Sequence, residues 1–259
     1  PYKLRSPHHD ADDEAYTQAC VADLVQVIDM MTAGDVACLI AEPIQGVGGF
    51  ATPPDGFFGA MHKVLDQHGI LFVSDEVQTG WGRTGEHFWG YQAHGVIPDM
   101  LTFAKGVGNG ITLAGIVGRA EIMDTLPHLS FSTFGGNPLS TAAGLATLRY
   151  VKEADLQGNA KARGQQMKDR LTPVVESTDW IVELRGKGLM QAIETVHPSS
   201  IEPDPKAAKM LLEHAKDRGL LIGKGGLYGN VLRLTPMLNI TEEEMDDGLD
   251  ALIAAIHSV

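Results

Sequence analysis

The sequence lacks the features that define several large classes of protein. It has two cysteines, Cys20 and Cys38, which provide neither a disulfide framework nor a metal framework. It has no basic run, and 33 acidic residues outnumber the 20 lysines and arginines to give a net charge of −13. No apolar stretch approaches the roughly 20 residues needed to cross a bilayer. We therefore expect no metal, nucleic acid or membrane as partner, and a reducing compartment, the cytoplasm or the mitochondrial matrix.

The chain also lacks an initiating methionine, an internal repeat and a low-complexity segment. It begins Pro1-Tyr-Lys-Leu-Arg5, which has no targeting pattern. This start is typical of the middle of a protein, so we expect a missing front, with which a targeting segment could have been lost. The composition, 44% hydrophobic and 20% charged, is typical of one large or two small globular domains.

Helical and strand-like patterns alternate in the first half of the chain. Apolar residues at three- and four-residue spacing predict helices at residues 16–31 and 58–65. Continuous apolar runs predict buried strands at residues 36–41 and 70–74, a strand that ends at Lys105 and one more at residues 113–117. This alternation predicts an α/β fold, a mostly parallel sheet with helices on both faces. Ligands of such sheets bind beyond the carboxyl ends of the strands, where Glu42, Asp75 and Lys105 lie.

The second half of the chain predicts a different arrangement. Asn137-Pro138 is typical of a helix start, and the small residues that follow allow close packing. Strands are expected at residues 180–184, 188–193, 220–222 and 231–234, with a helix at residues 207–217 and a last helix that opens on the capping box Thr241–Glu244. We expect part of a large domain over residues 1–157 and a smaller α+β domain over residues 158–259.

Lys105 and Asp75 carry the most specific chemistry. A lysine amine whose pKa is lowered by partial burial can form an imine with an aldehyde. Pyridoxal phosphate supplies an aldehyde, and a buried carboxylate keeps its ring nitrogen protonated. The residues by themselves leave a second interpretation open, in which both are solvated charges at strand ends.

Five ordered motifs resemble the signature of the class III pyridoxal-phosphate-dependent aminotransferases. They are Glu42-Pro-Ile-Gln-Gly46, Phe72-Val-Ser-Asp-Glu-Val-Gln-Thr-Gly-Trp-Gly-Arg-Thr-Gly85, Pro98-Asp99, Ala104-Lys-Gly106 and Thr133-Phe-Gly-Gly-Asn-Pro138. The resemblance runs to Val231-Leu-Arg-Leu-Thr-Pro236 and is nearest to the alanine–glyoxylate branch at residues 87–92, 133–136 and 219–223. It implies the type I fold of these transferases, with an incomplete large domain.

The resemblance also implies roles for individual residues. Lys105 would form the Schiff base and move the proton, and Asp75 would pair with the pyridinium. Val77 would pack on one ring face, and Gln78 would bond near the phenolic oxygen, although as a loop amide it could instead bond its own backbone. Thr133 would bond the phosphate of the neighbouring subunit, although by itself it is typical of a turn.

Two further residues concern the substrate. Arg233 matches the arginine that binds the substrate α-carboxylate, and the alternative is an arginine on the exposed face of a strand. Glu42 would join the network near the cofactor or bond local backbone. Relatives that use ornithine or 4-aminobutyrate have Gln-Gly-Glu-Gly-Gly where this chain has Gln45-Gly-Val-Gly-Gly49. Without that glutamate we expect Arg233 to be constantly available, which favours alanine, pyruvate and glyoxylate.

The family's N-terminal motifs are missing from this sequence. They include a loop that cups the cofactor phosphate and an aromatic that stacks on the ring, and Gly106-Val-Gly-Asn-Gly110 lacks the spacing to replace the loop. We expect a ping-pong transaminase that acts as a homodimer with shared active sites. The alternatives are another omega-aminotransferase for 4-aminobutyrate or β-alanine, a mutase or racemase on the same scaffold, and a non-catalytic truncated fragment.

Overall fold

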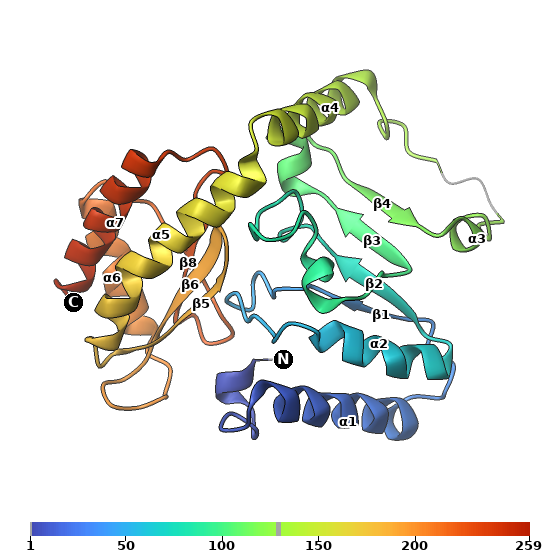
Figure 1. Cartoon of the computed structure of the whole chain (residues 1–259), viewed down its shortest axis with the longest axis horizontal. Helices are drawn as coiled ribbons and strands as arrows, with labels where there is room; N and C mark the ends of the chain where they lie inside the picture. The colour runs from blue at the N-terminus through green and yellow to red at the C-terminus, as the bar shows by residue number, and fades with distance from the viewer. Residues whose placement is uncertain (1, 128–130) are drawn as a thin grey trace. The chain divides into compact units, whose positions relative to one another are not determined.

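The computed structural model describes residues 2–127 and 131–259, which form two compact units (Figure 1). The first unit comprises Pro1–Pro43, Pro53–Trp81 and Trp89–Ala154, and the second comprises Ile44–Thr52, Gly82–Phe88 and Asp155–Val259. Two short segments of the first half therefore fold with the C-terminal residues. The predicted division into a large and a small domain after residue 157 stays a prediction.

A four-stranded sheet with the order β1-β2-β3-β4 organises the first unit. Its strands are β1 (Cys38–Ala41), β2 (Leu71–Asp75), β3 (Met100–Phe103) and β4 (Gly115–Gly118). The first three strands run parallel, and β4 is antiparallel to β3. The predicted α/β class with a mostly parallel sheet is thus confirmed, and the parallel order brings three consecutive strand ends to one edge.

Two helices, α1 (Asp13–Met31) and α2 (Phe57–His68), pack together against the sheet (Figure 1). Their core includes Tyr16, Phe58 and Leu65 with Phe72 of β2. The expectation that the first strand is buried on both faces is wrong, because Ile40 of β1 is 61% exposed. A continuous apolar run shows that a strand can be covered on both sides, but it does not show which elements cover it.

The remaining elements of the first unit are short turns and helices. They are the 3-10 helices η1 (Lys3–Arg5), η2 (Gly90–His94) and η3 (Lys105–Gly108), with α3 (Ala120–Met123) and α4 (Pro138–Glu153). Asn137 caps α4 as predicted, because its side chain accepts a hydrogen bond from the Ser140 backbone N–H. Gly144 of α4 lies so close to Leu113 that a Cβ there would come within 2.4 Å of a leucine methyl. The small residues of α4 therefore serve the close packing expected of them.

An antiparallel sheet with the order β5-β6-β8-β7 forms the second unit together with three helices. The elements are α5 (Leu156–Glu176), β5 (Ile181–Lys187), β6 (Met190–Thr195), α6 (Pro205–Asp217), β7 (Gly223–Gly225), β8 (Val231–Leu234) and α7 (Glu242–Ile256). Figure 1 shows α5 and α7 side by side over this sheet, and side chains from all three helices share its core.

Two predictions for the second unit have opposite outcomes. The capping box is confirmed, since Thr241 and Glu244 bond each other's backbone N–H at the start of α7. The strand predicted at residues 220–222 is wrong, because β7 begins at Gly223. Leu220 and Ile222 instead pack their side chains against the core of the unit. Within the described residues, no helix is long and apolar enough to cross a membrane.

Candidate active site

The three parallel strands end at one edge of the first sheet, which we call the carboxyl edge. Ala41 of β1 pairs with Ser74 of β2, so Glu42 follows β1 at the level of Asp75. Asp75 in turn pairs with Thr102 of β3, three residues before Lys105. The structure therefore brings Glu42, Asp75 and Lys105 to adjacent strand ends, as the alternation of helices and strands predicts.

Lys105 begins η3 in the left-handed backbone region, with φ of 48°. Residues other than glycine avoid this region at a cost of about 1 kcal/mol or more, and such strain concentrates at functional positions. The side chain is exposed, and its amine has no hydrogen bond or ion pair with any described residue. The expected partial burial of this lysine is therefore wrong, because η3 turns its buried positions, Val107 and Gly108, toward the protein and leaves Lys105 outside.

Asp75 ends β2 and is half-buried. Its Oδ1 accepts a hydrogen bond from the Val77 backbone N–H at 3.1 Å. Its Oδ2 has no hydrogen-bond partner among the residues that the structure describes. One carboxylate oxygen is thus fixed by the backbone, and the other is left to accept a bond from a ligand at the carboxyl edge.

Glu76, the next residue, has the opposite environment and was not recognised from the sequence. It is fully buried, and its two oxygens accept four hydrogen bonds. The donors are Ser74 Oγ at 3.1 Å, Thr79 Oγ1 at 2.5 Å, and the backbone N–H groups of Gly90 and Tyr91 at 2.8 Å each. Four bonds compensate the burial of the charge. Glu76 therefore ties the end of β2 to the start of η2 and fixes the backbone on which Asp75 lies.

The charge of Glu76 also affects its surroundings. Burial, and then the proximity of Glu76, raise the pKa of the Tyr91 hydroxyl. Tyr91 consequently stays protonated over the whole physiological range. No signal in the sequence alone separates Glu76 from Asp75, because two of its donors are backbone groups 14 and 15 residues further along the chain.

The other predicted cofactor residues are less closely connected. Val77 and Gln78 are half-buried in the turn after β2. The Gln78 side chain forms no hydrogen bond with a described residue, so the alternative in which it bonds its own backbone does not occur. Thr133 lies exposed in a turn, and within the described ranges no hydrogen bond or ion pair joins it to Asp75 or Lys105. Glu42 is half-buried directly after β1.

Arg233 lies in the second unit, on β8, where it pairs with Ala192 of β6 and Gly223 of β7. Its guanidinium lies 5.7 Å from the centre of the Phe50 ring, within the range of a cation–π contact. Its Nε is buried without a hydrogen-bond partner, and no carboxylate among the described residues pairs with it. The alternative of an exposed arginine on a strand is incorrect, since the residue is half-buried.

Val47 lies beside Arg233, at the position where some relatives carry glutamate. Both residues lie close to Gly225. A Cβ atom placed on that glycine would be 3.0 Å from Arg233 Cδ and 3.2 Å from the Val47 carbonyl oxygen. The Val47 carbonyl accepts a hydrogen bond from the Gly226 N–H at 3.0 Å. The valine side chain cannot neutralise the guanidinium, so the positive charge stays available to a ligand.

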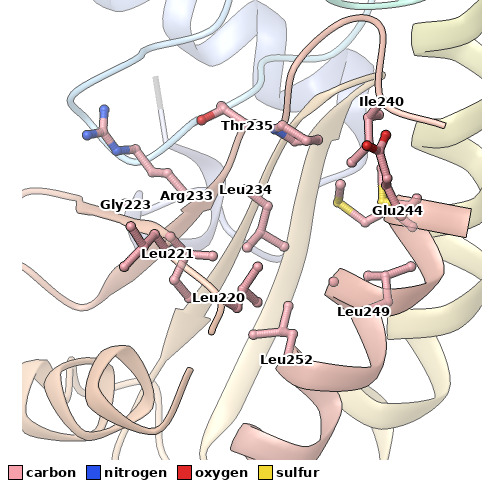
Figure 2. A pocket seen from close by; sticks show the side chains of 15 residues that line it. Leu220, Leu221, Gly223, Arg233, Leu234, Thr235, Ile240, Glu244, Leu249 and Leu252 are labelled. Carbon is pink, nitrogen blue, oxygen red and sulfur yellow. The ribbon is translucent and has the colours of Figure 1, made fainter. Parts of the chain in front are cut away.

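An apolar pocket of about 180 Å³ lies on the other side of β8. It is lined mainly by leucine, isoleucine and methionine side chains of β8, α5, α7 and the segment before β7, with Glu244 at its margin. Figure 2 shows the Arg233 guanidinium directed away from Leu220, Leu234 and Leu252, which form the body of this pocket. Arg233 thus contributes to the lining of the pocket, while its guanidinium points away from these leucines.

Comparison with known proteins identifies the family. The sequence profile described as aminotransferase class-III matches residues 2–256. The chain belongs to the class-III aminotransferase family. The predicted resemblance is thereby confirmed, and so is its assignment to a family of transaminase enzymes.

Relatives within the class-III aminotransferases have several activities. The mitochondrial alanine–glyoxylate aminotransferase 2 homolog 2 of Arabidopsis thaliana is 41% identical over 93% of this chain and 50% of that protein. A 4-aminobutyrate aminotransferase of Mycobacterium leprae is 39% identical over 89% of this chain and 52% of its own length. An alanine/serine racemase of Pyrococcus horikoshii is 41% identical over 86% of this chain and 46% of its own. The chain thus spans about half the length of these relatives, and their names do not agree on one substrate.

A solved structure supports the fold. The crystal structure of an amine transaminase from an uncultivated Pseudomonas species, in a form with bound pyridoxal phosphate, superimposes with a TM-score of 0.92 at 35% identity. It covers 100% of this chain and 60% of that chain. The fold class of the pyridoxal-phosphate transaminases predicted for this class-III aminotransferase chain is therefore confirmed.

Proposed function

We propose that the chain is the lysine-bearing part of an aminotransferase that moves an amino group between an alanine-like amino acid and an oxo acid such as glyoxylate or pyruvate. The observation that carries the proposal is the pair at the carboxyl edge. Lys105 offers an unpaired amine, and Asp75 offers a carboxylate oxygen without a partner, at the ends of adjacent parallel strands. Membership of the class-III family gives this pair its chemical context.

The residues present fit pyridoxal phosphate. An amine that is exposed and unpaired can condense with its aldehyde, and a half-buried carboxylate can accept a bond from its ring N–H. In this proposal Val77 packs against one face of the ring, and Gln78 bonds near its phenolic oxygen. Thr133 bonds the phosphate held by a second copy of the chain, so that the functional unit is a homodimer with shared sites.

When bound, pyridoxal phosphate supplies the electron-withdrawing ring that stabilises negative charge on the substrate carbon. The chain's own residues supply the rest. Lys105 would hold the cofactor through its amine, and the same amine would accept and return a proton at the substrate carbon. Asp75 keeps a negative charge at the end of β2 and so favours a protonated ring nitrogen. Glu42 adds a further hydrogen-bonding group at the same edge.

The substrate carboxylate is assigned to Arg233. A planar guanidinium can bind a carboxylate with two parallel hydrogen bonds, and this one has no competing carboxylate among the described residues. Val47 supports a preference for ordinary α-amino and α-oxo acids, because no glutamate at that position masks the charge.

Borohydride reduction tests the cofactor assignment. The full-length protein, loaded with pyridoxal phosphate and reduced, should carry a stable adduct that peptide mass spectrometry maps to Lys105. Lys105→Ala is the matched control and should carry none, while it stays folded because the side chain is exposed. An adduct on another lysine, or none on folded wild-type protein saturated with cofactor, contradicts the proposal.

Product analysis tests the reaction. With alanine and glyoxylate we expect pyruvate and glycine, and we expect turnover with 4-aminobutyrate to be lower. The racemase among the relatives makes racemisation a second candidate. Conversion of L-alanine to D-alanine without need for an oxo acid would favour it, and a strong preference for 4-aminobutyrate would contradict the role given to Val47.

The activity of the 259 residues by themselves is a further question. The chain spans about half of its curated relatives, and Ile40 on β1 is 61% exposed. Exposed apolar surface on a strand is a site where further chain can pack. A fragment without catalytic activity is therefore the alternative for these residues alone, and the borohydride experiment on both forms distinguishes the two. Localisation of a tagged full-length protein tests the expected compartment, the cytoplasm or the mitochondrial matrix.

A further inference from the structure

Residues 45–51 form a tight turn that folds against the β7–β8 hairpin of the second unit; we call it the 45–51 turn. It is closed by hydrogen bonds from Phe50 N–H to Gln45 O at 2.8 Å and from Gln45 N–H to Ala51 O at 3.1 Å. A third bond, from Gly226 N–H to Val47 O at 3.0 Å, joins the turn to the hairpin. The turn is therefore a fixed neighbour of β8, on which Arg233 lies.

Phe50 is the contact between this turn and Arg233. Its ring is 1% exposed and lies 5.7 Å from the guanidinium carbon. Its backbone is left-handed, with φ of 55°, and Gly49 before it has φ of 91°. Glycine adopts a positive φ freely, but a phenylalanine in this region is strained unless its surroundings hold it there. The orientation of the ring thus depends on whatever holds the Gly49–Phe50 peptide.

Arg185 of β5 holds that peptide. Its Nε donates to the Gly49 carbonyl oxygen at 2.8 Å, across 136 positions of sequence. Its Nη1 donates to Glu194 at 2.6 Å and to Glu183 at 2.7 Å. The side chain is 5% exposed, so these bonds are made largely without water. One guanidinium therefore joins the 45–51 turn to two strands of the sheet.

Glu194 anchors the other end of the guanidinium. It is fully buried on β6, and Asn230 donates to its Oε1 at 3.1 Å. Asn230 is the residue directly before β8, which begins at Val231, and its side chain also donates to the Thr195 carbonyl at 2.7 Å. Burial raises the pKa of Glu194 to about 7. The same buried cluster thus contacts the 45–51 turn on one side and the start of β8 on the other.

A purely stabilising role explains this cluster poorly. Replacing a buried ion pair by apolar side chains of similar size is often neutral or favourable for stability. The geometry gives the charges another use, because Nη1 of the guanidinium bonds two carboxylates while its Nε bonds one backbone carbonyl. Only an arginine can make both contacts at these directions, since a lysine ammonium has no second nitrogen on its stem.

We propose that Arg185 is a positioning residue for the substrate carboxylate: it fixes the Gly49–Phe50 peptide so that the Phe50 ring holds the Arg233 guanidinium in its binding orientation. The inference rests on the proposed role of Arg233. It assigns Arg185 no contact with substrate or cofactor. Loss of the Gly49 bond should let the ring and the guanidinium move, and so should weaken carboxylate binding while leaving the chemistry at Lys105 intact.

The test is carboxylate binding by Arg185→Lys in the full-length holoenzyme. The inhibition constant of propionate, which has a carboxylate but no amine to react, and the KM for alanine should both rise about tenfold, because displacement of a binding group by an ångström is costly. The kcat and the yield of borohydride adduct at Lys105 should stay within about twofold. Glu183→Gln is the matched control, because it removes the more exposed carboxylate on the same Nη1 and keeps the bond to Gly49.

Arg233→Met separates this inference from the proposal on which it rests. If Arg233→Met leaves propionate inhibition unchanged, Arg233 does not bind the carboxylate and the proposed function loses that residue. If Arg233→Met weakens inhibition and Arg185→Lys does not, the positioning role alone is overturned. If Glu183→Gln weakens propionate inhibition as much as Arg185→Lys does, the positioning role is also overturned. The effect would then come from the change of charge and not from loss of the Gly49 bond.

A second variant keeps the inference testable if Arg185→Lys does not fold. Glu194→Gln removes the bond that residue 194 accepts from either Arg185 or Asn230, because one oxygen becomes an amide nitrogen. We expect a rise of about threefold in the propionate inhibition constant with kcat kept, a smaller effect because the Gly49 bond survives. Unchanged inhibition by folded Glu194→Gln overturns the inference.

Discussion

The carboxyl edge of the first unit and the Arg185 cluster of the second use charged residues in opposite ways. At the carboxyl edge, the Lys105 amine has no partner among the described residues, and Asp75 is bonded through one oxygen only. In the Arg185 cluster, the guanidinium is bonded to Glu183, Glu194 and the Gly49 carbonyl. The groups that can meet a ligand therefore make at most one hydrogen bond each, whereas the group that holds the backbone makes at least three.

The same contrast separates two adjacent residues of one motif. Asp75 accepts a single hydrogen bond, while Glu76 accepts four and is fully buried. Both are carboxylates after the same strand, and residue type does not distinguish them. Their environments do, and substitution should affect activity in one case and stability in the other.

Asp75→Asn should have the largest effect, and it should fall on activity. The amide keeps an oxygen for the Val77 N–H but removes the negative charge, so we expect kcat/KM to fall about 10²- to 10³-fold, as for loss of an aligned electrostatic partner. The free energy of unfolding should change by less than about 1 kcal/mol, because the residue is half-buried and the bond is retained. Steady-state kinetics and urea unfolding measure the two quantities. A large loss of stability with activity kept would place Asp75 with the structural carboxylates.

The sequence predicts the carboxyl edge because the relevant signals are local. Apolar runs that end in Glu42, Asp75 and Lys105 show which groups follow the strands. Parallel pairing of the strands then brings these groups to the same edge of the sheet. The burial of these positions does not follow from the same pattern. Lys105 was expected to be partly buried and Ile40 to be covered, yet both are exposed, because a run of residues does not specify what packs over it.

The Arg185 cluster has no comparable local signal. The arginine contacts Gly49, which lies 136 positions away in the sequence. Its carboxylate partner Glu194 lies on the next strand, and a shift of the strand pairing by one residue would turn that side chain to the other face of the sheet. Glu76 was missed for a similar reason, since its backbone donors come from η2. The sequence therefore indicates groups with open capacity more readily than the buried charges that support them.

The pH dependence of stability should reveal Glu194. Its pKa of about 7 in the folded protein lies above the ordinary value of 4.5, because burial disfavours the charged form. The groups that face it are Arg185 of β5 and Asn230 before β8, with Glu183 on the shared guanidinium. The folded state binds the proton more tightly, so the stabilising contribution is present below pH 4.5 and is lost as the pH rises through about 7.

The matched comparison is wild type against Glu194→Gln, which cannot titrate. Between about pH 5 and pH 8 the free energy of unfolding of wild type should fall relative to the variant by up to about 3 kcal/mol. Urea unfolding at several pH values measures the difference. A difference that is independent of pH, or that grows in the opposite direction, would show that the ion pair with Arg185 outweighs burial.

Glu76→Gln should have the smallest effect of the three, and it should fall on stability. The amide nitrogen replaces an oxygen that faces either Thr79 and Gly90 or Ser74 and Tyr91. The hydroxyl can turn and accept from this nitrogen, but the backbone N–H of Gly90 or Tyr91 is left without an acceptor in a buried site. We expect the free energy of unfolding to fall by about 2 kcal/mol.

Glu86→Gln is the control for this change, because Glu86 is an exposed acid in the same motif region and its loss should cost less than about 0.5 kcal/mol. The yield of borohydride adduct at Lys105 in folded Glu76→Gln should stay close to that of wild type, since Glu76 supports the backbone and does not meet the ligand. Loss of the adduct with full stability would reverse the assignment of the two carboxylates. That outcome would show that the number of bonds a charged group has already made does not separate ligand-binding residues from supporting ones in this fold.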